Sequence, residues 1–243
     1  MKSIAVFSIK GGVGKSATAV NLAHAAATTG GRRTLLWDLD SQGAATYLLK
    51  LLPKTGVKAR AAVSGEVPIS ELVLQTEFPN LHVLPADKSL RRLEGDLAQS
   101  DKLKLLRKHL KALAADYDRI IIDCPPGLSE LADRLFRAVD LIVMPSIPSP
   151  LSSRAADQLR VELQRSHEGK PPILPLWSMA DGRRKLHRDS IALHPDWPII
   201  PYASAVESMA VHQAPVAVVQ PRSPAARAFA GLWAAVEAEL RKN

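Results

Sequence analysis

Short apolar runs alternate with helical patterns along this 243-residue chain, and the alternation limits its fold more than any other feature. A run that is apolar at consecutive positions fits a strand covered on both faces, as in a parallel sheet. The predicted strands are Ser3–Ile9, Thr34–Asp38, Leu81–Leu84, Arg119–Asp123, Leu141–Met144 and Ile173–Trp177. The predicted helices are Lys15–Thr28, Leu90–Ala115, Ser129–Arg137, Ser152–Arg165 and Pro224–Arg241. The sequence therefore predicts an α/β fold: a doubly wound, mostly parallel sheet flanked by helices, with ligands at the carboxyl ends of the strands.

The length of the chain allows one large α/β domain or two small ones. No repeat or linker composition divides it, so a single domain over residues 1–243 is predicted, with the poorly patterned stretch Pro53–Asn80 as a surface excursion. No apolar run approaches the roughly 20 residues of a membrane span, and the N-terminus does not read as a secretory signal. A cytoplasmic protein is expected. The single cysteine, Cys124, excludes an internal disulfide and any multi-cysteine metal site from one chain.

A glycine-rich turn, SIKGGVGKS at residues 8–16, connects the first predicted strand to the first predicted helix. Glycines let backbone N–H groups curl around a phosphate, and the N-terminus of the following helix adds its positive partial charge. In such a loop the lysine reaches the β- and γ-phosphates and the hydroxyl of the next residue binds Mg²⁺. Lys15 and Ser16 occupy those positions, whereas Ile9 stands where the standard pattern has glycine. The predicted nucleotide-binding residues here are Lys10, Gly11, Gly12, Val13, Gly14, Lys15, Ser16 and Ala17.

Carboxylates follow two of the predicted strands. Asp38 and Asp40 lie at the tip of the second strand, and Asp123 ends the apolar run Arg119–Asp123. Carboxylates at this end of the strands can hold Mg²⁺ through water and can orient an attacking water. Ser16, Asp38 and Asp123 are the predicted magnesium residues.

The loop at residues 10–16 resembles the deviant Walker A motif of the ParA/MinD superfamily, whose signature is an additional lysine placed as Lys10 is. Asp38–Gly43 is similar to the switch I segment of that family, and Arg119–Gly127 to its Walker B strand and switch II. This chain departs from the family at Ala17, where threonine is usual, and at Ser41, where proline is usual. The resemblance is strong to Pro150 and looser beyond it, and it does not cover Pro53–Asn80.

The resemblance implies a P-loop NTPase fold and a slow ATPase that uses ATP and Mg²⁺. It implies that Lys10 reaches the phosphates of a partner chain in a nucleotide-sandwich homodimer, and that Asp40 positions or activates the attacking water. Lys10, Lys15 and Asp40 are therefore the predicted catalytic residues. The segment from Ile200 to Ala210 resembles the one that flanks adenine, so Pro201 and Tyr202 are predicted to bind the nucleotide.

The net charge of +8 favours a polyanionic partner, although a proteome rich in arginine would give the same excess. Proteins of the ParA family bind duplex DNA without sequence preference through basic residues of the C-terminal half. By that resemblance the predicted DNA-binding residues are Arg183, Arg184, Lys185, Arg188 and Arg222. For the basic run at residues 183–188, the alternative interpretation is a charged face that only contacts solvent.

The family also implies a nucleoid-associated ATPase that segregates or positions a cargo, stimulated by a ParB-like or cargo-bound protein. One alternative is a membrane-associated regulator like MinD, in which the C-terminal helix binds lipid. The apolar positions Phe229, Leu232, Trp233, Val236 and Leu240 favour packing on the core instead, so no membrane partner is expected. A second alternative is an ATP-dependent biosynthetic ligase of the same superfamily, such as dethiobiotin synthetase.

Overall fold

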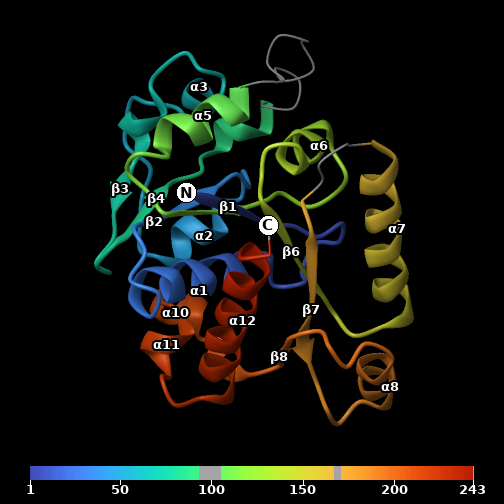
Figure 1. Ribbon diagram of the computed structural model, residues 1–243. Coiled ribbons are helices and arrows are strands. Elements are labelled where there is room, and N and C mark those ends of the chain that lie inside the picture. The colour runs from blue at the N-terminus through green and yellow to red at the C-terminus, as the bar shows by residue number, and fades with distance from the viewer. Residues whose placement is uncertain (93–104, 167–170, 243) are drawn as a thin grey trace.

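The computed structural model describes residues 1–92, 105–166 and 171–242 (Figure 1). An eight-stranded sheet runs through this part in the order β3-β4-β2-β5-β1-β6-β7-β8. All neighbouring strands are parallel except β3, which is antiparallel to β4. The strands are β1 (Lys2–Val6), β2 (Thr34–Asp38), β3 (Leu74–Gln75), β4 (Leu81–Leu84), β5 (Arg119–Asp123), β6 (Leu141–Ser146), β7 (Ile173–Ala180) and β8 (Ile199–Pro201). The predicted fold class is thereby confirmed.

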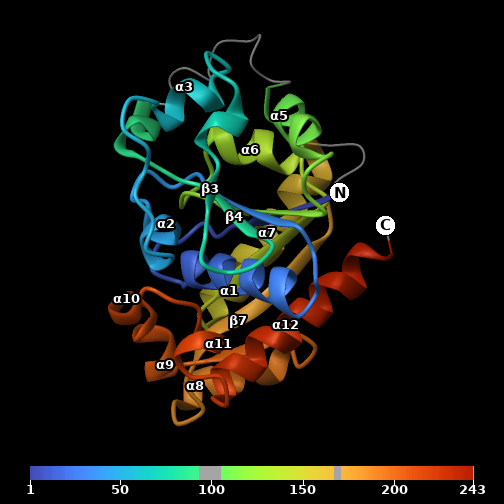
Figure 2. The ribbon, with the colours of Figure 1, turned by 90° about the vertical axis from the view of Figure 1, so that its left-hand side faces the viewer.

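Helices cover both faces of the sheet. The main helices are α1 (Lys15–Thr28), α5 (Leu105–Leu113), α6 (Glu130–Phe136), α7 (Pro150–Ser166), α8 (Lys185–Leu193) and α12 (Pro224–Leu240). Shorter helices are α2 (Ala44–Leu48), α3 (Ala59–Val63), α9 (Ser204–Glu207), α10 (Met209–His212) and α11 (Val216–Val219), with 3₁₀ helices at Ile69–Leu72 and Lys88–Arg92. In Figure 2, β3 and β4 lie between α5 and α6 above and α1 and α12 below.

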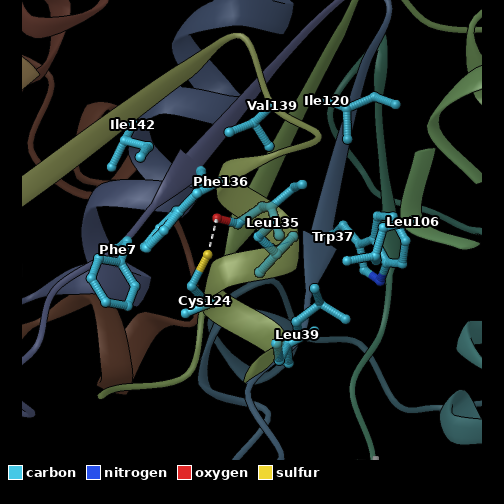
Figure 3. Close-up of a cluster of buried hydrophobic side chains, with 14 of the residues drawn as sticks. Phe7, Trp37, Leu39, Leu106, Ile120, Cys124, Leu135, Phe136, Val139 and Ile142 are labelled. Atoms are coloured by element: carbon cyan, nitrogen blue, oxygen red, sulfur yellow. Dashed lines mark hydrogen bonds between the residues drawn. The ribbon is translucent and has the colours of Figure 1, made fainter. Parts of the chain in front are cut away.

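The central strands divide their side chains between two cores, one on each face. Because alternate residues of a strand point to opposite faces, Ile120 and Ile122 enter the core under α5, α6 and α7, whereas Ile121 enters the core under α1 and α12. In the first core the rings of Phe7 and Phe136 meet edge to face, with their centroids 4.8 Å apart (Figure 3). Strands buried on both sides in this way explain the unbroken apolar runs of the sequence.

Three predictions about elements need correction. β1 ends at Val6, not at Ile9, because its pairing with β5 and β6 ends there. Phe7 and Ile9 still contribute to the core, from the loop that follows. Leu90–Ala115 is not one helix, because Leu90 lies in a 3₁₀ helix and α5 covers Leu105–Leu113; residues 93–104 lie outside the described part. Pro53–Asn80 is more than a surface excursion, since its helices bury side chains in the core. Those side chains are Ala59, Ala62, Val63, Ile69 and Leu72.

Candidate functional site

The loop between β1 and α1 turns at the carboxyl end of the central strand. Gly12 and Gly14 have φ values of 73° and 83°, a conformation that side chains with a Cβ rarely adopt. A Cβ at Gly14 would also lie 3.0 Å from Ser178 Oγ. α1 begins directly after Gly14 without a side-chain cap, so its first N–H groups are left to an anion or to water.

Lys15 and Ser16 are the first residues of α1. The Lys15 side chain is buried, and its Nζ donates to the carbonyl oxygen of Lys10 at a long 3.4 Å. A buried ammonium group held so weakly gains much from a phosphate placed beside it. Lys10 itself is exposed at the outer side of the loop, where its side chain is accessible to a second molecule.

Asp123 lies next to this loop at the end of β5. It is fully buried, and within the described residues neither of its carboxylate oxygens has a hydrogen-bond partner. Burial raises the pKa of Asp123 well above its usual value, and the charge of Asp38 raises it further, while the Ser16 hydroxyl and Lys15 oppose the rise. A cation at this point would compensate the buried carboxylate.

The available oxygen atoms fit Mg²⁺. Ser16 offers a hydroxyl and Asp123 a carboxylate, and Mg²⁺ prefers oxygen ligands, of which it usually takes only one or two from the protein. No group of three or more His, Cys, Asp or Glu side chains suited to a metal occurs in residues 1–92, 105–166 and 171–242. The remaining ligands would come from water and phosphate oxygens.

Asp38 faces Asp123 in register on the neighbouring strand. Its Oδ2 accepts hydrogen bonds from the Thr46 N–H (2.9 Å) and hydroxyl (2.7 Å), and its Oδ1 accepts one from the Asp40 N–H (3.2 Å). Burial nevertheless raises the pKa of Asp38 to about 6. Because these bonds tie Asp38 to α2, its first role is to shape the segment between β2 and α2, and its contact with metal stays a prediction.

Asp40 is half-buried and accepts a hydrogen bond from the Gln42 N–H through Oδ1 (2.9 Å). Its charge raises the pKa of both Asp38 and Asp123, so the three carboxylates share one site. The structure thus brings together every residue predicted from the loop and the two strand ends.

A mostly apolar pocket lies between the start of α1 and the ends of β7 and β8. Its lining comprises Gly14, Ala17, Thr18, Ser178, Met179, Ile200, Pro201, Tyr202, Ala203, Val206, Glu207 and Phe229. Pro201 and Tyr202 therefore lie beside the phosphate loop, as the prediction for a nucleotide site requires. Sequence reasoning missed Ser178 and Met179, because it ended the strand at Trp177, and it assigned no role to Glu207.

The basic run lies at the start of α8, directly after β7. Asp181 accepts hydrogen bonds from Arg183 Nε (2.9 Å) and Nη2 (3.0 Å) and forms an ion pair with Arg184 (3.5 Å). Lys185 pairs with Asp189 at 2.6 Å. These carboxylates offset part of the positive charge, although the side chains of Arg183, Arg184 and Lys185 remain 83%, 69% and 80% exposed.

The other predicted basic residues differ in their surroundings. Arg188 donates through Nη1 to the carbonyl oxygens of Gly182 (2.9 Å) and Arg183 (3.0 Å), so it belongs to the α8 group. Arg222 is exposed in the turn before α12, on a separate element. The structure therefore places four of the five predicted residues in α8 or directly before it, and Arg222 on a different element.

The C-terminal helix α12 buries the predicted apolar positions Phe229, Leu232, Trp233, Val236 and Leu240. It packs against α1, with which it lies side by side in Figures 1 and 2. Its apolar side chains are thus already covered by protein. In the described residues, no helix is both long enough and apolar enough to cross a membrane.

The AAA domain family profile matches residues 1–173. The chain is similar to the chromosome partitioning protein ParA of Myxococcus xanthus, with 37% identity over 190 residues that cover 75% of this chain and 66% of that protein. It is also similar to the sporulation initiation inhibitor protein Soj of Bacillus subtilis, with 30% identity over 249 residues that cover 95% and 96%. The chain thus spans just under two thirds of the first relative and nearly all of the second.

Solved structures with the same fold include the McdA–ATP complex of Cyanothece, with a TM-score of 0.84 and 20% identity over 98% of this chain and 96% of that one. Cobyrinic acid a,c-diamide synthase of Mycobacterium smegmatis, with bound ADP and magnesium, is 30% identical, with a TM-score of 0.73 over 88% and 91% of the two chains.

Proposed function

Because this chain belongs to the ParA/MinD superfamily of P-loop ATPases, we propose that it binds Mg-ATP at residues 10–16 and hydrolyses it slowly as a nucleotide switch. The observation that carries the proposal is the buried Asp123 carboxylate, which lacks a hydrogen-bond partner in the described residues and lies beside Ser16 and Lys15. Such a group destabilises the protein unless a ligand compensates it.

Each residue of the site has a distinct role in this proposal. The loop N–H groups and Lys15 hold the β- and γ-phosphates, and Ser16 and Asp123 hold Mg²⁺, which supplies charge neutralisation on the phosphates. Asp40 orients the attacking water, and Asp38 keeps the segment that carries Asp40 in place through Thr46. The apolar pocket with Pro201 and Tyr202 receives the base.

The switch acts through a homodimer. Lys10 is exposed, and Lys15 already occupies the position from which a lysine reaches the phosphates of its own chain. Lys10 is therefore free to contact the phosphates of a second molecule across a shared nucleotide.

The dimer binds duplex DNA without sequence preference and positions or segregates a cargo. The exposed basic group of α8, with Arg222, supplies the phosphate contacts. The names of the Myxococcus and Bacillus relatives refer to chromosome partitioning and to sporulation, which supports a cargo-positioning role. A ParB-like or cargo-bound protein stimulates hydrolysis, and the protein acts in the cytoplasm on the nucleoid.

A biosynthetic ligase is the second candidate, because the similar Mycobacterium structure is named a cobyrinic acid a,c-diamide synthase. A ligase would need a small substrate where the partner molecule lies in the proposed dimer. ATP turnover that requires a carboxylic acid substrate and proceeds in a monomer would favour the ligase. The membrane-associated alternative has less support, since the apolar face of α12 is buried.

The ATPase proposal is tested first at Lys15. Replacing Lys15 with alanine removes the only buried ammonium among the described residues of the loop, so binding of Mg-ATP should be lost by isothermal titration calorimetry. Lys50→Ala, which changes an exposed lysine paired with Glu77, should bind like the wild type. Unchanged binding in Lys15→Ala would place the nucleotide elsewhere.

A further inference from the structure

Glu207 places a carboxylate at the rim of the pocket beside the phosphate loop. Its Oε1 accepts a hydrogen bond from the Tyr202 hydroxyl at 2.7 Å. Tyr202 is fixed in turn, because its N–H donates to the carbonyl oxygen of Ala180 at 2.9 Å, which joins it to the end of β7. The pair therefore has a defined position at the carboxyl end of the sheet.

The walls of this pocket suit a flat aromatic ring. Ala17, Met179, Pro201 and Val206 are apolar, and the half-exposed ring of Tyr202 adds an aromatic surface. Polar side-chain groups are few, and Glu207 supplies the only carboxylate among the described residues of the lining. Pockets with apolar walls and a few placed polar groups orient a ligand through those groups.

We propose that Glu207 selects the base of the nucleotide, because its Oε2 accepts a hydrogen bond from the exocyclic amine of adenine. The inference rests on the proposed function, since it requires a triphosphate held at Lys15. An ionised carboxylate only accepts hydrogen bonds. Adenine presents an amine at C6, whereas guanine presents an oxygen there, and two acceptors facing each other repel.

The Tyr202 hydroxyl explains why a carboxylate here favours adenine over guanine. Guanine offers N1–H and an amine at C2, and these two donors bind best to both oxygens of one carboxylate. Tyr202 already occupies Oε1, and it is the one hydrogen-bond partner that the Glu207 side chain has among the described residues. One oxygen remains, which matches the single amine of adenine.

Calorimetry with Mg²⁺ complexes of ATP, GTP and purine riboside triphosphate, which lacks the amine, tests the proposal. The wild type should prefer ATP to both of the others. Glu207→Ala should lose about tenfold in affinity for ATP, the scale of a hydrogen bond to a charged group. Its affinity for purine riboside triphosphate should not change, because that ligand never makes the bond.

Tyr202→Phe separates the hydroxyl from the ring. The ring surface remains while Oε1 becomes free, so the ratio of ATP affinity to GTP affinity should fall. Glu77→Ala is the matched control, because Glu77 is a comparably exposed glutamate that follows β3, at the opposite edge of the sheet from β8. It should leave every ratio at the wild-type value.

These measurements separate a failure of the proposed ATP binding from a failure of base selection by Glu207. If the wild type binds none of the three triphosphates, the proposed function fails and base selection fails with it. If the wild type binds ATP but Glu207→Ala keeps the same ratio of ATP to purine riboside triphosphate, base selection by Glu207 is wrong and the ATPase proposal stands. An unchanged ratio of ATP to GTP in Tyr202→Phe would remove Tyr202 from the selection.

Discussion

At the scale of single residues, Asp123 is the most unusual group in the described part of the chain. It is a fully buried carboxylate beside a second one, Asp38, and burial raises the pKa of both. Folding two such groups close together costs free energy that hydrophobic burial elsewhere must offset. The arrangement is understandable if Mg²⁺ and a phosphate complete it, since perturbed carboxylates of this kind concentrate at functional sites.

Asp40 allows hydrolysis to be separated from binding. Its carboxylate is half-buried and, among the described residues, accepts a hydrogen bond from the Gln42 N–H alone, so it can reorient towards a water molecule. Asp40→Ala should keep the affinity for Mg-ATP and lower the hydrolysis rate by roughly 10²- to 10⁴-fold, the usual contribution of a general base. A phosphate-release assay measures the rate, with Asp157→Ala, an exposed aspartate of α7, as control. Normal turnover by Asp40→Ala would remove this residue from catalysis.

The phosphate and magnesium residues could be predicted from sequence because they are neighbours along the chain or end apolar strands. Thr46, Ser178 and Glu207 could not, since each reaches the site from another element. Thr46 binds Asp38 from α2, and Ser178 approaches Gly14 from β7. Their types are common on any surface, so only the fold reveals what they contact.

At the scale of elements, long helices and buried strands could be predicted from the sequence, whereas the shortest helices could not. The central strands are buried on both faces and appear in the sequence as unbroken apolar runs, whereas α12 is buried on one face and shows apolar residues at helical spacing. Helices α9, α10 and α11 have four residues each, which is barely one turn, so no apolar stripe can repeat. α8 was missed because its charged start was interpreted as a surface run.

Protonation of His109, where α5 meets α3, should destabilise the protein in acid. The Nε2 of buried His109 lies 3.0 Å from the Val63 carbonyl oxygen, and desolvation lowers the pKa of His109 below its usual 6.5. Since the unfolded chain then binds the proton more readily, the free energy of unfolding should fall as the pH decreases from 6.5. His109→Gln can keep a donor but does not titrate, so urea denaturation across this range should show a smaller acid loss than the wild type. Equal losses would contradict the assignment.

The start of α8 should make salt-dependent contacts with DNA. Each phosphate contact releases counterions, so log K falls with log salt at a slope of about −0.9 per contact. Arg184→Ala and Arg222→Ala should each flatten the slope by roughly one and weaken all sequences alike. Fluorescence anisotropy on unrelated duplexes measures this, with Lys50→Ala as control for an exposed lysine near the other edge of the sheet. Unchanged slopes would mean that the basic residues at the start of α8, which pair with Asp181 and Asp189, contact solvent and not DNA.

At the scale of the whole molecule, the groups with proposed chemical roles lie at the carboxyl ends of the strands. The phosphate loop, the three carboxylates, the base pocket and the start of α8 all follow the carboxyl ends of strands. β1 lies between β5 and β6. On one side of β1 lie β2 to β5 and on the other β6 to β8, so the strand order reverses at β1. Open α/β sheets bind ligands at such a switch point. A nucleotide bound by residues 10–16 would therefore lie at the same end of the strands as the exposed Lys10 and the start of α8.

If ATP switches this protein between a monomer and a dimer, the mass of the particle in solution must change when nucleotide is added. Light scattering after size exclusion should give Asp40→Ala the 26.3 kDa of one chain without nucleotide and twice that mass with Mg-ATP. Lys10→Ala, added to Asp40→Ala, should bind ATP and remain a monomer. A dimer of unchanged affinity in the double variant, or a monomer of Asp40→Ala saturated with ATP, would contradict the account.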